Sequence, residues 1–143
     1  SPPLSQTGHP HYRSPAYFEN YVKSVVDKVQ ANSKVWEQTA ILVTYDEGGG
    51  YFDSGYVQAV DFFGDGTRIP MIAVSKWAKS GHVDHSYSDH ASIHKFIQRN
   101  WGLKPLSSRS RDNLPNPVHS TDAYVPDNRP AVGDLMNLFQ FKP

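Results

Sequence analysis

Residues 41–53 constrain the fold of this chain most strongly, because an apolar run ends there in two adjacent carboxylates followed by three glycines. Residues 41–45 have the length and the aliphatic, β-branched character of a strand buried on both faces, a pattern typical of parallel sheets. In open α/β sheets, ligands bind just beyond the carboxyl ends of the strands. Asp46 and Glu47 stand at that position, and residues 48–50 permit a sharp turn or a close backbone approach. The sequence therefore predicts a metal site at a strand end.

The same two carboxylates also have a simpler interpretation. Asp46 can cap the turn that follows the strand, while Glu47 is merely solvated. Adjacent residues of a strand point to opposite faces, so both carboxylates reach one ion only if the backbone turns where the strand ends. A short motif of this kind leaves both interpretations open.

Local signals predict an α/β order around this strand. Ser14 and Pro15 form a helix start, and apolar residues recur at helical spacing up to a predicted end near residues 32–33. Strands are expected at 40–45 and 68–75, separated by a glycine-containing loop over 53–67. A second long helix follows, with Gly102 as its stop. Its predicted buried residues are Ile93, Phe96, Ile97 and Trp101.

The C-terminal third of the chain is expected to be irregular. Prolines punctuate residues 104–131, and residues 133–141 carry an apolar docking face. Arg109, Arg111 and Asp112 are interpreted as a structural pin that holds this long segment in place.

Composition limits the chemistry that is available. The chain has 143 residues, a length sufficient for one domain with a real core. Its 14 basic and 14 acidic residues balance, so no basic field favours nucleic acid. There is no cysteine, which leaves seven histidines and the carboxylates as metal ligands. No apolar stretch is long enough for a transmembrane segment, and no signal peptide is visible.

A second group of candidate ligands precedes and enters the second long helix. His90 and His94 are four residues apart and share a helix face, and His85 and Asp89 lie in the loop before them. Imidazole and carboxylate together suit zinc or another divalent transition metal. Histidines at such positions are also often plain surface residues, most readily in the case of His94.

Asp53 and Arg68 form a third candidate pair. Asp53 follows the glycines closely and could orient a ligand as a hydrogen-bond acceptor. Arg68 could bind phosphate as a fork-shaped donor, although a salt bridge within the protein is the simpler explanation.

Familiar catalytic motifs do not occur in this sequence. There is no Gly-x-Ser-x-Gly elbow, no Walker loop and no His-Glu-x-x-His sequence. Ser75 and Ser92 are candidate nucleophiles only by elimination. A nucleophile, if the reaction uses one, is therefore expected on another chain.

Four segments taken together resemble the bacterial phosphoesterase family that includes non-haemolytic phospholipases C and acid phosphatases, within the alkaline phosphatase-like superfamily. They occur in the family's order and are residues 39–53, 64–75, 89–97 and 110–114. The resemblance implies a metal-assisted α/β sandwich with a central, mostly parallel sheet flanked by helices. It makes the chain the C-terminal portion of a single domain, with core motifs over 15–114 and an irregular extension over 115–143.

The resemblance also implies roles for particular residues. Asp46 and Glu47 match the family's acidic ligands of a divalent metal ion, and His90 matches a histidine near the site. Asp53, Arg68, His85 and Asp89 are weaker candidates for supporting or substrate contacts. Ser54 stands where the family often has histidine, which puts the substrate preference in question.

By the same resemblance, the nucleophile belongs to the N-terminal portion of the enzyme, expected as a separate partner chain, and this chain alone should be inactive. The substrate would be a phosphoester, and family habit suggests a periplasmic or secreted protein. Two alternatives stay open. One is a non-catalytic binding or assembly module derived from the same fold, and the other is a sulfatase or phosphomutase relative.

Overall fold

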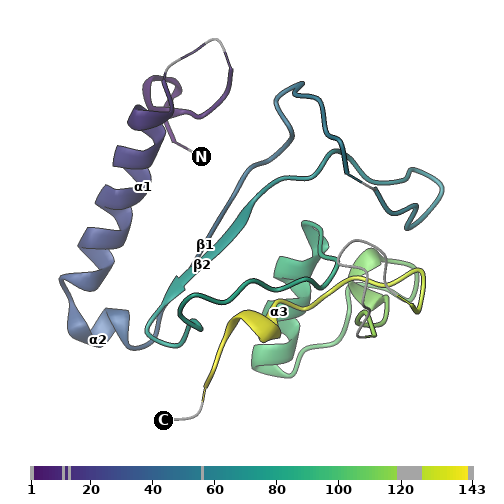
Figure 1. Cartoon of the computed structure of the whole chain (residues 1–143). Helices are drawn as coiled ribbons and strands as arrows, with labels where there is room; N and C mark the ends of the chain where they lie inside the picture. The colour runs from purple at the N-terminus through teal and green to yellow at the C-terminus, as the bar shows by residue number, and fades with distance from the viewer. Residues whose placement is uncertain (1, 11, 13, 56, 119–126, 142–143) are drawn as a thin grey trace. The chain divides into compact units, whose positions relative to one another are not determined.

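The computed structural model describes residues 2–10, 12, 14–55, 57–118 and 127–141 (Figure 1). Its regular elements follow the order η1 (Leu4–Gln6), α1 (Pro15–Gln30), α2 (Ser33–Trp36), β1 (Ala40–Thr44), β2 (Met71–Ser75), α3 (Ala91–Trp101), η2 (Arg111–Asn113) and η3 (Met136–Leu138). The chain forms two compact units. Unit 1 comprises residues 1–52 and 69–78, and unit 2 comprises residues 53–68 and 79–143.

The predicted start of the first helix is confirmed. Ser14 has extended backbone angles at the N-cap of α1, and Pro15 occupies the first helical position, where its missing N–H costs no hydrogen bond. The helix ends at Gln30, slightly before the predicted end. The short helix α2 follows, and the Asn32 side chain caps it by accepting a hydrogen bond of 3.3 Å from the Val35 N–H.

The predicted strands exist, but the parallel arrangement is wrong for this pair. β1 and β2 are antiparallel, with Ala40 opposite Ser75 and Thr44 opposite Met71. Parallel neighbours need a crossover connection, usually a helix. The described residues between the two strands contain neither helix nor strand, so the chain simply turns back on itself. A mixed α/β chain with a two-stranded sheet is observed, and the mostly parallel sandwich is not seen in the described residues.

Burial of the strands on both faces is also not observed. Four of the five residues of β1 are half-buried, and Ile72 of β2 is 56% exposed. Two strands with one long helix offer too little apolar surface to enclose a sheet on both sides. Polar contacts reinforce the pair instead. The Thr44 hydroxyl donates to the Pro70 carbonyl at 2.8 Å, and the Ser75 hydroxyl donates to the Thr39 carbonyl at 2.8 Å.

The buried apolar residues of the described chain all belong to unit 2. The Phe96 ring of α3 stacks on Phe139 with centroids 5.0 Å apart, which confirms the predicted docking of the C-terminal segment. The other buried apolar residues are Val60, Ala131, Val132 and Leu135. This small core fixes α3 against the end of the chain.

The predicted buried face of α3 is partly wrong. Phe96 is buried as expected, but Ile97 and Trp101 are 41% and 64% exposed. Ser92 and Lys95 are buried in their place. The Lys95 ammonium donates to the carbonyls of Leu114 and Val132 at 2.7 and 2.5 Å, so a charged side chain occupies a position that hydrophobicity alone would not predict. Gly102 ends the helix with φ of 63°, as predicted.

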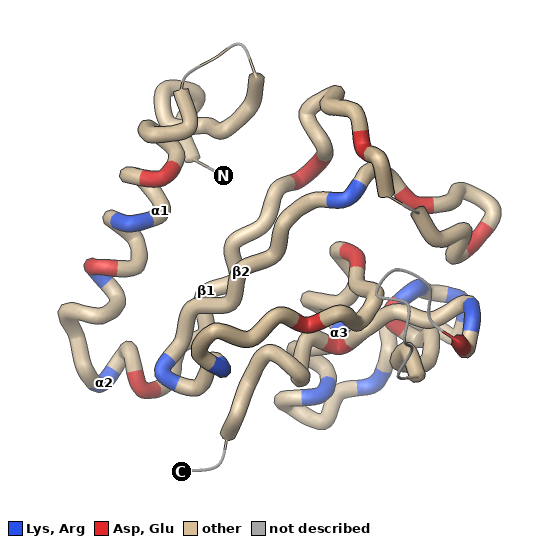
Figure 2. The backbone as a smooth tube through the Cα atoms, viewed as in Figure 1, with Lys and Arg blue, Asp and Glu red and all other residues tan. Residues whose placement is uncertain are grey.

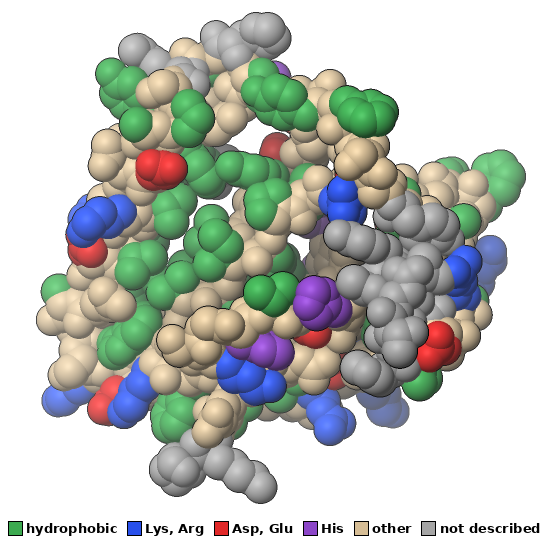
Figure 3. Space-filling model, in the orientation of Figure 1, with side chains coloured by type: hydrophobic (Ala, Val, Ile, Leu, Met, Phe, Trp, Pro, Cys, Tyr) green, Lys and Arg blue, Asp and Glu red, His purple; other side chains and the backbone are tan. Residues whose placement is uncertain are grey.

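Lys and Arg positions are interspersed with Asp and Glu positions along the backbone (Figure 2). Many hydrophobic side chains also reach the surface (Figure 3). No helix in the described ranges has both the length and the apolar character that crossing a membrane requires.

Candidate active site

Asp46 and Glu47 come just after the end of β1, separated from its last residue, Thr44, by Tyr45, and both are exposed. Glu47 turns back on the glycines, since its Oε2 accepts a hydrogen bond of 2.6 Å from the Gly49 N–H. Gly49 itself has φ of +66°, a left-handed conformation that favours glycine. A Cβ there would also meet the Pro10 ring at 3.1 Å. The glycines thus form the turn that holds Glu47 at the strand end.

The other oxygen of Glu47 faces an unpredicted neighbour. Oε1 lies 3.6 Å from Nε2 of His9, which comes from the segment before α1. Among the described residues, none forms a hydrogen bond or ion pair with the Asp46 carboxylate. Two adjacent carboxylates with accessible oxygens match the ligands that hard divalent cations prefer. They do not form a complete cage, because no group of three His, Asp or Glu residues suited to a metal gathers within the described ranges.

Asp53 and Arg68 close the base of the 53–68 segment in unit 2. Arg68 Nη2 donates to Asp53 Oδ1 at 2.6 Å, and the Arg68 backbone N–H donates to Oδ2 at 2.7 Å. The Gly55 N–H adds a third bond to Oδ1 at 2.9 Å. The Arg68 side chain, followed by these backbone donors, holds the pKa of Asp53 well below its usual range. The predicted salt bridge of Arg68 is confirmed.

Gly55 has a steric role in this pair. A Cβ at that position would lie 2.1 Å from the Arg68 guanidinium carbon. Glycine therefore leaves the room in which the guanidinium reaches Asp53. Both carboxylate oxygens of Asp53 form hydrogen bonds within unit 2, so the role of Asp53 is to hold the two ends of the 53–68 segment together.

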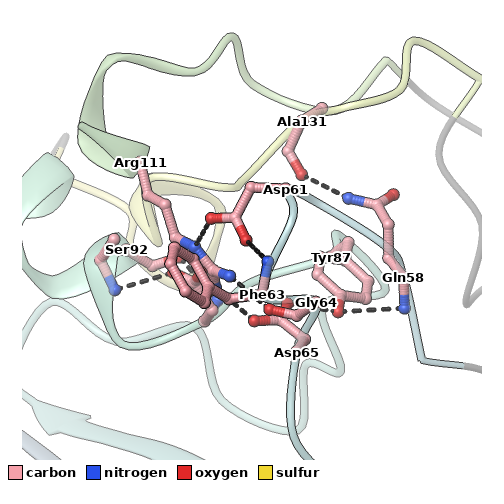
Figure 4. A network of polar contacts seen from close by, with 11 residues as sticks. Gln58, Asp61, Phe63, Gly64, Asp65, Tyr87, Ser92, Arg111 and Ala131 are labelled. Carbon is pink, nitrogen blue, oxygen red and sulfur yellow. Dashed lines mark hydrogen bonds and ion pairs between the residues drawn. The ribbon is translucent and has the colours of Figure 1, made fainter. Parts of the chain in front are cut away.

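Arg111 is the centre of the densest polar network in the described part of unit 2 (Figure 4). Its Nε donates to Asp61 at 2.7 Å, and its Nη1 donates to both Asp65 and Asp89, the latter at 3.0 Å. Its Nη2 donates to the Gly64 carbonyl. The hydrogen bond that Arg111 donates to Asp61 contributes most to raising the pKa of Arg111, so the guanidinium stays charged. One guanidinium therefore ties three carboxylates from two loops to η2.

Tyr87 extends this network to the C-terminal segment. Its hydroxyl donates to Asp65 at 2.6 Å and accepts from the Gln58 N–H at 3.2 Å. Burial, together with the hydrogen bond to Asp65, raises the pKa of Tyr87 far above its usual value. The buried Gln58 amide then donates to the Ala131 carbonyl at 3.0 Å. The 53–68 segment is thus joined to residues distant in sequence.

The predicted group of His85, Asp89, His90 and His94 is not assembled as a metal site in the described structure. Asp89 uses one oxygen for Arg111 and the other for the Ala91 N–H, at 2.7 Å. His90 stands at the N-cap of α3, and His85, His90 and His94 are all exposed. His90 belongs to unit 2, whereas Asp46 and Glu47 belong to unit 1.

The structural pin predicted in the C-terminal third is confirmed for Arg111 and Asp112. Asp112 is buried and accepts hydrogen bonds from Gln98 at 2.5 Å and from the Leu106 N–H at 2.8 Å. Burial opposes its ionisation, but these bonds and one from Ser110 outweigh burial and lower its pKa to about 2. Arg109 is exposed, and within the described part of the chain it is held only by its backbone N–H, which donates to the Ser107 hydroxyl at 3.2 Å.

Several members of these sites were not predicted, namely His9, Asp61, Asp65 and Tyr87. Asp61 and Asp65 lie 50 and 46 residues before Arg111. No local spacing rule connects residues so far apart. The only signal was the presence of residues 64 and 65 in one of the four segments that resemble the phosphoesterase family.

Comparison with known proteins decides the family. Residues 1–104 match the model of the Phosphoesterase family. The chain belongs to this family. The resemblance stated from the four sequence segments is thereby confirmed.

Relatives of this phosphoesterase-family chain include several phospholipases. It is 28% identical to hemolytic phospholipase C of Pseudomonas aeruginosa, over 98% of this chain and 20% of that protein. It is 30% identical to non-hemolytic phospholipase C of Burkholderia pseudomallei, over 97% of this chain and 22% of that protein. A plant relative, non-specific phospholipase C1 of Arabidopsis thaliana, is 27% identical over 66% of this chain. The chain spans about a fifth of the length of the bacterial relatives.

Proposed function

We propose that this chain is part of a metal-dependent phosphoesterase that hydrolyses phosphate esters, with Asp46 and Glu47 as ligands of a divalent metal ion. The observation that supports the proposal best is the family match over residues 1–104, which includes this acidic pair. The pair lies exposed at the end of β1, and the Gly49 turn holds Glu47 in place. Oxygen ligands at a strand end suit a hard cation.

The residues of this chain would bind the metal ion and orient the substrate, and none of them would act as the nucleophile. Asp46 and Glu47 would present carboxylate oxygens to the ion, and His9 would restrain Glu47 from one side. A divalent ion bound there would neutralise charge on the phosphoryl oxygens. His90 is proposed to act on the substrate or the leaving group, consistent with its match to the family segment. The nucleophile would come from the N-terminal portion of the same enzyme, as a separate chain.

The names of the relatives suggest the substrate class. The bacterial and plant relatives named above are phospholipases C, so the proposed substrate is the phosphodiester of a phospholipid headgroup. A periplasmic or secreted location is proposed from family habit alone. A non-catalytic binding module remains the competing outcome, and it would bind no metal at the acidic pair.

The test combines metal binding with catalysis. In the protein at its natural length, equilibrium dialysis against Mn²⁺, Ca²⁺ or Zn²⁺ should give one bound ion per molecule, and Asp46→Asn or Glu47→Gln should lower the affinity for that ion at least tenfold. Glu19→Gln, which removes an exposed carboxylate from α1 in the same unit, is the matched control. In the protein at its natural length, the same two variants should abolish phosphodiester hydrolysis. Metal affinity that is equal in all three variants would refute the proposal.

A further inference from the structure

Two adjacent aromatic side chains in unit 2 stand almost entirely in solvent. Phe62 is 95% exposed and Phe63 is 88% exposed, with their ring centroids 5.4 Å apart in an edge-to-face arrangement. Single exposed apolar residues are common and need no explanation. Two consecutive phenylalanines exposed at a loop tip are costly in water, because each carries a large apolar area.

Hydrogen bonds hold the backbone around these rings in place. The Phe63 N–H donates to Asp61 Oδ1 at 2.8 Å, and the Gly64 N–H donates to the Asp61 carbonyl at 3.1 Å (Figure 4). Arg111 holds both the Asp61 carboxylate and the Gly64 carbonyl. Gly64 has φ of +69°, which another residue would adopt only with strain. These contacts, called the Arg111 clamp below, fix the backbone of residues 61–64, which carries the two rings.

The charge around the tip narrows the choice of partner. Three carboxylates, those of Asp61, Asp65 and Asp89, surround the single guanidinium of Arg111. The base of the tip is therefore net negative, which disfavours nucleic acid and anionic lipid. A lipid layer without net charge is not repelled by these carboxylates.

The apolar tip formed by Phe62 and Phe63 is too small for a stable protein interface. Two phenylalanine side chains offer about 300–500 Å² together. A specific protein interface buries about 800 Å² on each partner. A small apolar area suits weak, reversible attachment to a lipid surface, because the strength of such binding scales with the apolar area that is buried.

We propose that residues 61–64 form a membrane-surface anchor that inserts Phe62 and Phe63 into the interface of a zwitterionic phospholipid layer. The choice of a lipid surface rests on the proposed function, because a phospholipid substrate must be reached at such a surface. The Arg111 clamp keeps the two rings ready for insertion, so little ordering is needed on binding.

Partition into phosphatidylcholine vesicles tests the anchor without any catalytic readout. The protein at its natural length should bind the vesicles, and Phe62→Ala/Phe63→Ala should lower the partition coefficient by about tenfold for each ring removed. Leu106→Ala is the matched control, because Leu106 is an apolar residue of the same unit, 72% exposed, that does not belong to residues 61–64. It should leave the partition unchanged. Raising the salt concentration should not weaken binding, since no charge attraction is involved.

A reporter variant shows whether the tip itself enters the lipid. Phe62→Trp should keep the partition and gain fluorescence quenching by brominated lipid beyond that of the native tryptophans. Unchanged partition of the double alanine variant, or a Phe62→Trp signal that brominated lipid does not quench, would overturn the anchor. A melting temperature lowered by Phe62→Ala/Phe63→Ala would also overturn it, because the rings would then pack against protein. Asp46→Asn should retain full vesicle binding, so failure of the metal site and failure of the anchor are distinguishable.

Discussion

Replacing Arg111 with alanine should destabilise unit 2 more than any exposed charge substitution. Arg111 donates to three carboxylates and to the Gly64 carbonyl, and its side chain is 28% exposed. Asp65 and Asp89 are each only 12% exposed. Arg111→Ala therefore leaves two largely buried carboxylates close together without their shared cation.

The expected magnitude follows from this geometry. Removing one partner of a fully buried ion pair costs about 3–5 kcal/mol. Asp61 is 38% exposed, so water screens its pair with Arg111 and that pair contributes little. We therefore expect Arg111→Ala to lower the free energy of unfolding by about 2–4 kcal/mol. Arg111→Lys keeps the charge but loses the planar fork, so it should recover only part of this loss.

Urea denaturation followed by circular dichroism measures this change. Arg109→Ala is the matched control, because it removes an exposed arginine two residues away and should change stability by less than about 0.5 kcal/mol. A double-mutant cycle of Arg111→Ala with Asp89→Asn should show coupling. An Arg111→Ala loss no larger than that of Arg109→Ala would refute the reasoning about the network.

Two further predictions concern buried charges of unit 2. The pKa of Asp112 is lowered from 3.8 to about 2, so its contribution to stability is complete above pH 3.8 and is lost as the pH falls toward 2. The loss of stability between pH 3.8 and pH 2 should therefore be smaller in Asp112→Asn than in the wild type. Acid profiles that are identical in the two proteins would contradict this prediction. Lys95→Met keeps the length of the side chain but deprives the Leu114 and Val132 carbonyls of their donor, so urea denaturation should show a loss of about 1–3 kcal/mol. Equal stability of Lys95→Met and the wild type would contradict the buried role of the ammonium.

Local rules predicted the two long helices and the two strands, but not the short helix α2. Ser14 and Pro15 marked the start of α1, and Gly102 marked the end of α3, because capping depends on a few neighbouring residues. Strand direction could not be predicted in the same way. A continuous apolar run is typical of parallel strands but carries no information on direction, which the connection between the strands decides.

The candidate site was predicted only where its parts are adjacent in sequence. Asp46 and Glu47 were identified because a strand end and a carboxylate pair coincide there. The partners of Arg111 lie 22 to 50 residues away, so their meeting depends on the path of the whole chain. Lys95 was missed because periodicity assigns buried positions to apolar side chains, whereas here two backbone carbonyls hold the ammonium.

Metal binding by Asp46 and Glu47 is measured by equilibrium dialysis with elemental analysis of the protein at its natural length. We expect one divalent ion per molecule in the wild type and in Glu19→Gln. We expect strongly weakened binding in Asp46→Asn and in Glu47→Gln. A protein that binds no divalent ion, or binds one equally well after both substitutions, would show that these carboxylates are not metal ligands.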